Sequence, residues 1–449
     1  MTRLKLASRN ALVCCILFSA LGVADPGALA RSHENSWRDI TDRAGEAMRE
    51  GRDQEALAGY KDAVTEAEKV KAEDDLLARS YENLGRFYKR RRDFENACLY
   101  FTRALERRRE ALTETAEPVA DSLEDIIYCL FDQRRYEALG PRIDELLALR
   151  EKQYGSHSPE LIRPLELESR LYRDLRDYNR CQQYLERLQS INVKAFGGKS
   201  VEAAESLRDL ARNRRDQRRY ADAAALYEKA LAIQEKAMPG ESGGRNHPDI
   251  ARTLDEIADC YRHEERYDRA IEALSRSLSI KEKLYGEEHL EVARTLGDLA
   301  DCRANSHQEK EARADYERQL TILRKVLGED HMDCAHALDR LANLERQCDD
   351  LPAAIEAATS SLNVREKLLG KKSLETARHI RWVAGMYSQK GELEKAESML
   401  LDEQDRLARG SREYLNVLRD RRHLLQRLKK DKEAEALDRK IKSMEKKSP

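Results

Sequence analysis

The sequence is poor in the residues that interrupt regular backbone structure. It contains 20 glycines and 9 prolines among 449 residues, about half of their average share in proteins. Sheet-rich folds need many turns, and turns rely on these two residues. The shortage therefore disfavours a sheet-rich fold and excludes a collagen-like sequence.

Neither sign of charge is in excess, because 82 basic residues face 84 acidic ones and the formal net charge is −2. This balance gives no reason to expect nucleic acid or an anionic membrane as a partner. Charged residues nevertheless make up 37% of the chain, against about 25% on average. A chain so rich in charge needs a large surface relative to the size of its core, and elongated helical folds provide such a surface.

Long apolar runs are absent except for residues 11–24 near the N-terminus. Three basic residues precede this run, and a helix-breaking Asp25-Pro26-Gly27 and the small-residue sequence Ala28-Leu29-Ala30 follow it. The run is shorter than the roughly 20 residues of a membrane span. Its layout is typical of a secretory signal. We expect residues 1–30 to be a cleaved signal peptide, with an uncleaved anchor as the alternative.

A period of 42 residues organises the rest of the chain. The residues that follow successive short breaks are Asp74, Ala116, Ser158, Ser200, His247, His289, His331 and Ser373. One step is 47 residues long, because the loop 239–246 carries an insertion. Alanine usually stands four residues after the break and leucine seven residues after it, a spacing that places both on one face of a helix.

A second helix is expected in each period, after a short polar turn. It usually opens with an aromatic or large apolar residue, namely Phe94, Tyr136, Tyr178, Tyr220, Tyr267, Leu351 or Leu393. Three residues later a small residue usually stands, which lets two helices approach closely. Each period is thus predicted to be an antiparallel helix pair that buries its apolar stripe only by stacking on its neighbours.

These residues resemble the tetratricopeptide repeat, and the segment His247-Pro248-Asp249-Ile250-Ala251 is similar to the longer repeats of the kinesin light chain type. The resemblance implies an all-α fold, a right-handed α-solenoid of about ten stacked antiparallel helix pairs. Its core spans residues 74–410. Residues 31–73 are expected to form a degenerate N-terminal helix pair, and residues 411–449 to form C-terminal capping helices.

Candidate catalytic and metal-binding residues are few. Gly240-Glu241-Ser242-Gly243-Gly244 matches the nucleophile elbow of hydrolases, but an elbow needs a preceding strand, and here two helices flank it. His247, His289 and His331 each lie one repeat apart, too far to share a metal ion, so we interpret them as helix-entry residues. We expect no cofactor, no metal and no catalysis.

The cysteines show no metal-binding or redox spacing. Seven remain after signal removal, and most occupy apolar or small-residue positions of the repeat. We expect mostly free, buried thiols. Cys348, at a turn between helices, is expected to be the most reactive.

Arginines dominate the face that the resemblance assigns to an inner groove. In tetratricopeptide solenoids, first-helix side chains off the packing stripe line this groove. The candidate peptide-binding residues are Arg163, Arg170, Arg173, Arg208, Arg212, Arg215, Arg252 and Arg294. Arginine suits bidentate recognition of carboxylates, so the partner is expected to be a protein or peptide, possibly acidic. The alternative is a solvated face in which salt bridges contribute little.

The preferred hypothesis is an exported, non-catalytic scaffold that binds a peptide or protein in its groove, in the periplasm or outside the cell. A self-assembling structural or regulatory scaffold is the alternative, and a hydrolase using Ser242 is a remote one. The sequence leaves the oligomeric state and the identity of the partner open.

Overall fold

The computed structural model describes residues 26–69, 74–113, 115–237, 247–409 and 411–445. Within these ranges the chain forms twenty α-helices and one short 3-10 helix, and it has no strand. None of the described helices is both long and apolar enough to cross a membrane. The chain divides into two compact units, Met1–Gly198 and Lys199–Pro449, a division that the unbroken repeat does not predict.

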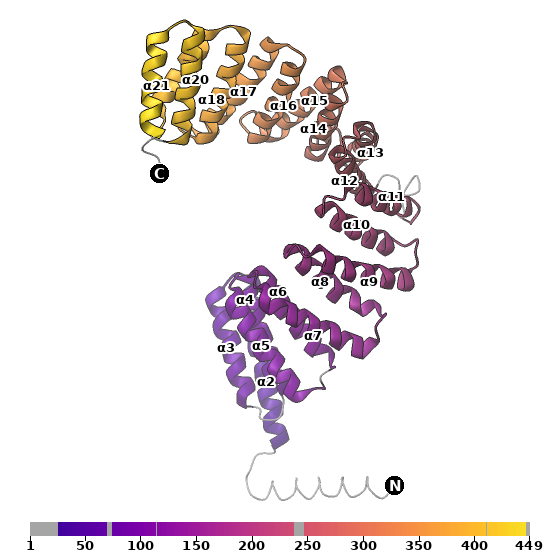
Figure 1. Cartoon of the computed structure of the whole chain (residues 1–449). Coiled ribbons are helices and arrows are strands. Elements are labelled where there is room, and N and C mark those ends of the chain that lie inside the picture. Colours follow the sequence, from indigo (N-terminus) through magenta and orange to yellow (C-terminus); the bar gives the residue numbers. More distant parts are fainter. Residues whose placement is uncertain (1–25, 70–73, 114, 238–246, 410, 446–449) are drawn as a thin grey trace, which may run out of the picture. The chain divides into compact units, whose positions relative to one another are not determined.

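The first unit is a stack of four helix pairs (Figure 1). Consecutive helices run side by side, and each pair packs on the next. Its elements are α2 (Pro26–Arg49), α3 (Asp53–Lys69), α4 (Asp74–Arg90), α5 (Phe94–Ala111), α6 (Glu117–Asp132), α7 (Tyr136–Tyr154), η1 (Pro159–Leu161), α8 (Ile162–Asp174) and α9 (Tyr178–Phe196).

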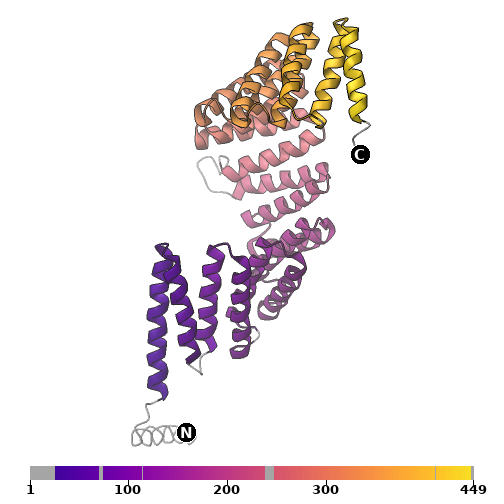
Figure 2. The same ribbon diagram turned by 90° about the vertical axis from the view of Figure 1, so that its left-hand side faces the viewer.

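The second unit continues the same arrangement with six pairs (Figure 2). Its elements are α10 (Val201–Asp216), α11 (Tyr220–Ala237), α12 (Pro248–His263), α13 (Tyr267–Tyr285), α14 (Leu290–Asn305), α15 (Glu309–Leu327), α16 (Met332–Gln347), α17 (Leu351–Leu369), α18 (Leu374–Lys390), α19 (Leu393–Arg406), α20 (Arg412–Arg427) and α21 (Asp431–Glu445). The predicted all-α stack of about ten pairs is confirmed.

The predicted second helices begin at the predicted residues, from Phe94 of α5 to Leu393 of α19. Pro26 and Gly27, expected to act as helix breakers after the apolar run, form the first turn of α2. Proline is compatible with the first turn of a helix, because its missing N–H would have no partner there. The apolar run 11–24 lies outside the described residues.

The residues after the breaks act as helix caps. The side chains of Ser158, Ser200 and Ser373 accept hydrogen bonds from backbone N–H groups of the first turn. His247, His289 and His331 do the same through Nδ1, 3.1–3.2 Å from the N–H two residues later. A cap satisfies an N–H group that has no partner inside the helix. The prediction that these histidines are helix-entry residues is confirmed.

Turns between the helices use the left-handed backbone conformation. Five glycines with φ of 79–91° end the second helices, namely Gly155, Gly197, Gly286, Gly328 and Gly370. Non-glycine residues adopt φ near 60° in most turns within a pair, namely Arg92, Arg134, Arg176, Arg218, Glu265, His307, Asp349 and Lys429. Glycine takes this conformation without strain.

Small residues hold the pairs together at their core. The alanines four residues after the breaks, from Ala78 to Ala377, are at most 1% exposed, as is the small residue near the start of each of α5, α9, α11, α13, α15, α17 and α19. The first helices of successive pairs also contact one another, as α14 contacts α16 and α18 contacts α20. In a curved stack of helix pairs, the helices on the concave side lie closer to one another than those on the convex side. The contacts between successive first helices therefore place the first helices in the inner, concave layer of each unit.

None of the seven cysteines of the described residues forms a disulfide. Cys129, Cys181, Cys260, Cys302 and Cys334 are buried, whereas Cys98 and Cys348 are half-buried. The prediction of mostly free, buried thiols is confirmed for these residues.

Candidate functional site

Three candidate arginines lie on α8 in the first unit. The Arg163 guanidinium lies 5.1 Å from the ring centre of Tyr128, and that of Arg170 lies 4.8 Å from the ring centre of Phe131. Both rings belong to α6, the preceding first helix, and guanidinium–ring stacking is favourable. Arg163 is exposed and 3.3 Å from Glu166. Arg173 is half-buried and makes no ion pair within the described ranges.

Two candidates in the second unit are engaged with the protein itself. Arg208 and Arg212 on α10 both reach Glu256 on α12, at 3.2 Å and 3.4 Å. The side chain of Arg208 is only 7% exposed. Its ion pair with Glu256 therefore links two first helices, and its guanidinium group is not open to a partner. Arg212 also lies 2.7 Å from Asp209. Removing one member of such a buried pair leaves the other charge uncompensated, which costs about 3–5 kcal/mol.

The remaining candidates differ in exposure. Arg215 is half-buried, 3.8 Å from Asp216. The side chains of Arg252 and Arg294 are 62% and 70% exposed, and each pairs with an acid three residues earlier on its own helix, at 3.1 Å and 2.9 Å. Exposed pairs of this kind contribute about 0–1 kcal/mol. These guanidinium groups therefore remain available to a partner at small cost.

The sequence interpretation missed a set of bases buried beneath the inner layer. The fifteenth residue of a second helix is Arg108, Arg150, Lys281 or Arg365 in four of the pairs, and each is 4–6% exposed. Each base pairs with an acid on the first helix of its own pair, eight residues after the break. In the same order, these acids are Glu82, Glu124, Asp255 and Asp339. We call each such set a buried base–acid pair.

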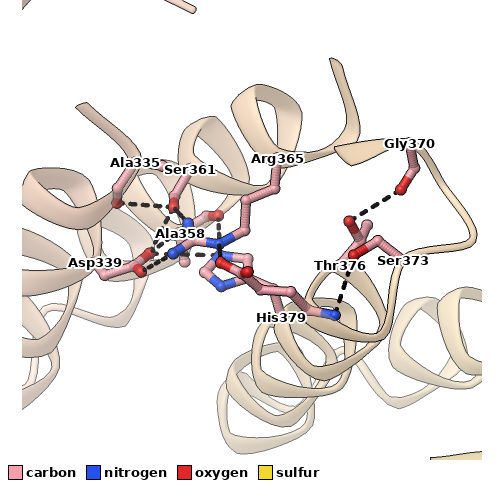
Figure 3. A network of polar contacts seen from close by, with 10 residues as sticks. Ala335, Asp339, Ala358, Ser361, Arg365, Gly370, Ser373, Thr376 and His379 are labelled. Atoms are coloured by element: carbon pink, nitrogen blue, oxygen red, sulfur yellow. Dashed lines mark hydrogen bonds and ion pairs between the residues drawn. The ribbon is translucent and has the colours of Figure 1, made fainter. Parts of the chain in front are cut away.

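Arg365 shows the geometry of a buried base–acid pair (Figure 3). Its Nη2 donates to the Asp339 carboxylate at 2.8 Å, and its Nε donates to Glu375 at 3.3 Å. The Ser361 hydroxyl lies 2.6 Å from the same Asp339 carboxylate. His379 lies 3.0 Å from the Ala358 carbonyl oxygen, and burial lowers the pKa of this histidine. The network ties α16, α17 and α18 together.

Lys281 repeats this geometry two pairs earlier. Its Nζ donates to Asp255 at 2.6 Å and to the Thr295 hydroxyl at 2.7 Å, while Ser277 lies 2.6 Å from Asp255. The two networks are related by 84 residues, twice the period. The sequence signal was an acid and a base at fixed positions of the repeat, which a search for apolar periodicity overlooks.

Ser242 and its glycine-rich segment lie outside the described residues. Within the described ranges, no three histidine, cysteine or acidic side chains gather as a metal site would require.

Solved structures of similar proteins are helical repeat proteins. A putative kinesin light chain from Podospora anserina is 22% identical, covering 46% of this chain and 95% of its own, with a TM-score of 0.42. BtubC (BKLC) from P. vanneervenii is 19% identical, covering 54% and 90%, with a TM-score of 0.41. Part of a repeat protein from Cytophaga hutchinsonii is 12% identical, covering 66% and 97%, with a TM-score of 0.46. No curated protein matches the sequence.

Family models give the assignment directly. Two models, both described as tetratricopeptide repeat, match residues 169–236, 249–312, 302–367 and 77–114. These matches lie on the helix pairs, and together with the repeated caps, small residues and inner layer of first helices they show that the chain belongs to the tetratricopeptide repeat family.

Proposed function

We propose that this chain is a non-catalytic scaffold that binds an acidic segment of a protein partner on its inner layer. The fold is typical of protein–protein interaction. The observation that carries the proposal is the exposed guanidinium groups on the inner layer of each unit, namely Arg163 and Arg170 in the first unit and Arg252 and Arg294 in the second. Repeat solenoids offer extended surfaces of this kind for binding.

The charge pairs of these arginines favour exchange with a partner. Arg163, Arg252 and Arg294 pair with Glu166, Asp249 and Glu291, and each of these acids is on the same helix as its arginine and at least partly exposed. A partner carboxylate that replaces such an acid loses little, and it gains the bidentate geometry that arginine provides. Arg208, which holds Glu256 in a buried pair, is left out of the proposed contact set.

A peptide array tests this proposal. The native chain is expected to bind acidic peptides, and the combined Arg163→Glu, Arg170→Glu and Arg252→Glu variant is expected to bind them about tenfold more weakly or worse, because charge-assisted hydrogen bonds contribute about 1.5–3 kcal/mol each. The matched control reverses two arginines of second helices, the half-buried Arg107 and the exposed Arg276. Equal losses in both variants, or binding unchanged in the first, would contradict the proposal.

We further propose that residues 1–30 direct export of the chain to the periplasm or the cell exterior. The basic start and the apolar run 11–24 support this. N-terminal sequencing of the chain purified from its producing cells should read from Arg31. A chain that retains Met1 and stays in the cytoplasm would contradict export.

A further inference from the structure

The pair formed by α14 and α15 lacks the buried base–acid pair that both of its neighbours possess. In the α12/α13 pair the three positions hold Asp255, Ser277 and Lys281, and in the α16/α17 pair they hold Asp339, Ser361 and Arg365. Between them, the corresponding residues are Gly297, Gln319 and Leu323. The acid, the hydroxyl and the base are all replaced at once, between two pairs that keep all three.

A cavity of about 240 Å³ lies where this pair is interrupted. It opens between the first helices α14 and α16, and α15 supplies its floor. The side chains that matter to its chemistry are Arg294, Gln319, Leu323, Asp333, His336 and Arg340.

Gln319 is part of the wall of this cavity. Its side chain is 8% exposed, yet its Oε1 has no hydrogen-bond partner among the described residues. A Cβ atom at position 297 would clash with the Gln319 Nε2. Glycine at 297 therefore makes room for the amide. A buried polar atom without a partner costs about 1–3 kcal/mol, and a ligand that donates a hydrogen bond would recover it.

The lining of the cavity includes two arginines, Arg294 and Arg340. Arg294 is 70% exposed and paired only with Glu291 of its own helix, and Arg340 lies 3.1 Å from Asp301. Asp333 is the one acid of the lining, and it lies 3.6 Å from His331. The floor has no acid, because Gly297 stands where Asp255 and Asp339 stand in the flanking pairs. The floor has no base either, because Leu323 stands where Lys281 and Arg365 stand, so a carboxylate would approach the two guanidinium groups beside an uncharged floor.

We propose that this cavity is a specificity pocket that takes one glutamate or aspartate side chain of the bound segment. Arg294 and Arg340 hold the carboxylate, and Gln319 Oε1 accepts a hydrogen bond from a backbone N–H of the same segment. The proposal rests on the proposed function and adds to it a fixed position for one acidic residue.

Restoring the missing base–acid pair tests the pocket without disrupting the fold. The variant Gly297→Asp, Gln319→Ser, Leu323→Arg installs the residues of the α16/α17 pair, so its thermal unfolding should stay close to that of the native chain. The probe is a library of immobilised octapeptide pools, each with Glu, Asp, Gln or Lys fixed at one position. The native chain is expected to bind the best Glu or Asp pool about tenfold better than the matching Gln pool, and the variant is expected to lose this preference.

A single substitution guards against misfolding of the triple variant. Arg294→Gln is expected to reduce the Glu-over-Gln preference severalfold. Its control is Arg79→Gln, which removes an arginine from the same position of the repeat, also exposed and paired on its own helix, but next to the intact Glu82–Arg108 pair. The control should keep the preference.

The outcomes separate the pocket from the proposed function. If no pool binds the native chain, both fail. If pools bind without a carboxylate preference, the pocket and the acidic character of the partner are both wrong, and only a peptide-binding scaffold stands. If the native chain shows the preference and the triple variant keeps it, the pocket alone is wrong and the proposed function stands.

Discussion

At the scale of single residues, Glu168 is the least expected side chain of the first unit. It lies on α8 with no exposed surface, and neither carboxyl oxygen has a hydrogen-bond partner among the described residues. Leucine occupies the corresponding position in other repeats, as at Leu84 and Leu299. Burial, reinforced by the nearby Asp144 carboxylate, raises the pKa of Glu168 to about 8. The protonated form is therefore the one that the fold accepts.

This shift predicts a stability that falls as pH rises. A raised carboxyl pKa means that the folded chain binds the proton more strongly than the unfolded chain between about pH 4.5 and pH 8. Its contribution to stability is complete below that window and lost above it. Glu168→Leu should therefore raise the free energy of unfolding by about 1–3 kcal/mol at pH 9 and by less at pH 5. Urea unfolding at both pH values measures this, and an equal change at the two would refute the assignment.

The cysteines allow a second test at this scale. Burial raises the pKa of Cys129 and Cys260 to about 12 and that of Cys302 to about 11, so their thiolates are scarce at neutral pH. Cys348 and Cys98 are half-buried. Iodoacetamide at pH 8 should label these two first, as peptide mass spectrometry can show. Early labelling of Cys302 instead would mean that the α14 core opens readily.

At the scale of elements, the buried base–acid pairs join each second helix to the first helices beside it. The native interruption at Gly297, Gln319 and Leu323 shows that the chain tolerates the loss of all three members together. Buried ion pairs behave this way, because a lone buried charge is costly while an apolar replacement of the whole pair can be neutral.

This reasoning predicts strong coupling between Arg365 and Asp339. Arg365→Leu alone should lower the free energy of unfolding by about 3–5 kcal/mol. The combined Arg365→Leu, Asp339→Gly and Ser361→Gln variant, which copies the native interruption, should recover most of that loss. A double-mutant cycle by denaturant unfolding measures the coupling. Additive losses would show that the network of Figure 3 does not act as a unit.

At the scale of the whole molecule, the repeat made most of the fold predictable. Aromatic residues such as Tyr136 and Tyr267 gave the second-helix starts, because every repeat buries the same stripe in the same way. Whether each arginine is buried or exposed was harder to predict from the sequence. Arg208 of α10 is buried against Glu256 of α12. These two residues are far apart in the sequence, so their contact could not be predicted from it. The grouping into two units after Gly198 was also hidden, because the period continues in register there.

The central claim is that the inner layer binds the partner, and site-specific photo-crosslinking tests it most directly. The photoreactive residue p-benzoylphenylalanine would replace Arg163 or Arg252 on first helices, and Arg107 or Arg276 on second helices as matched controls. With the best-binding acidic peptide of the array, crosslinks should form from the photoreactive residue at positions 163 and 252 and not from the control positions. Crosslinks from the second-helix positions alone would contradict the account.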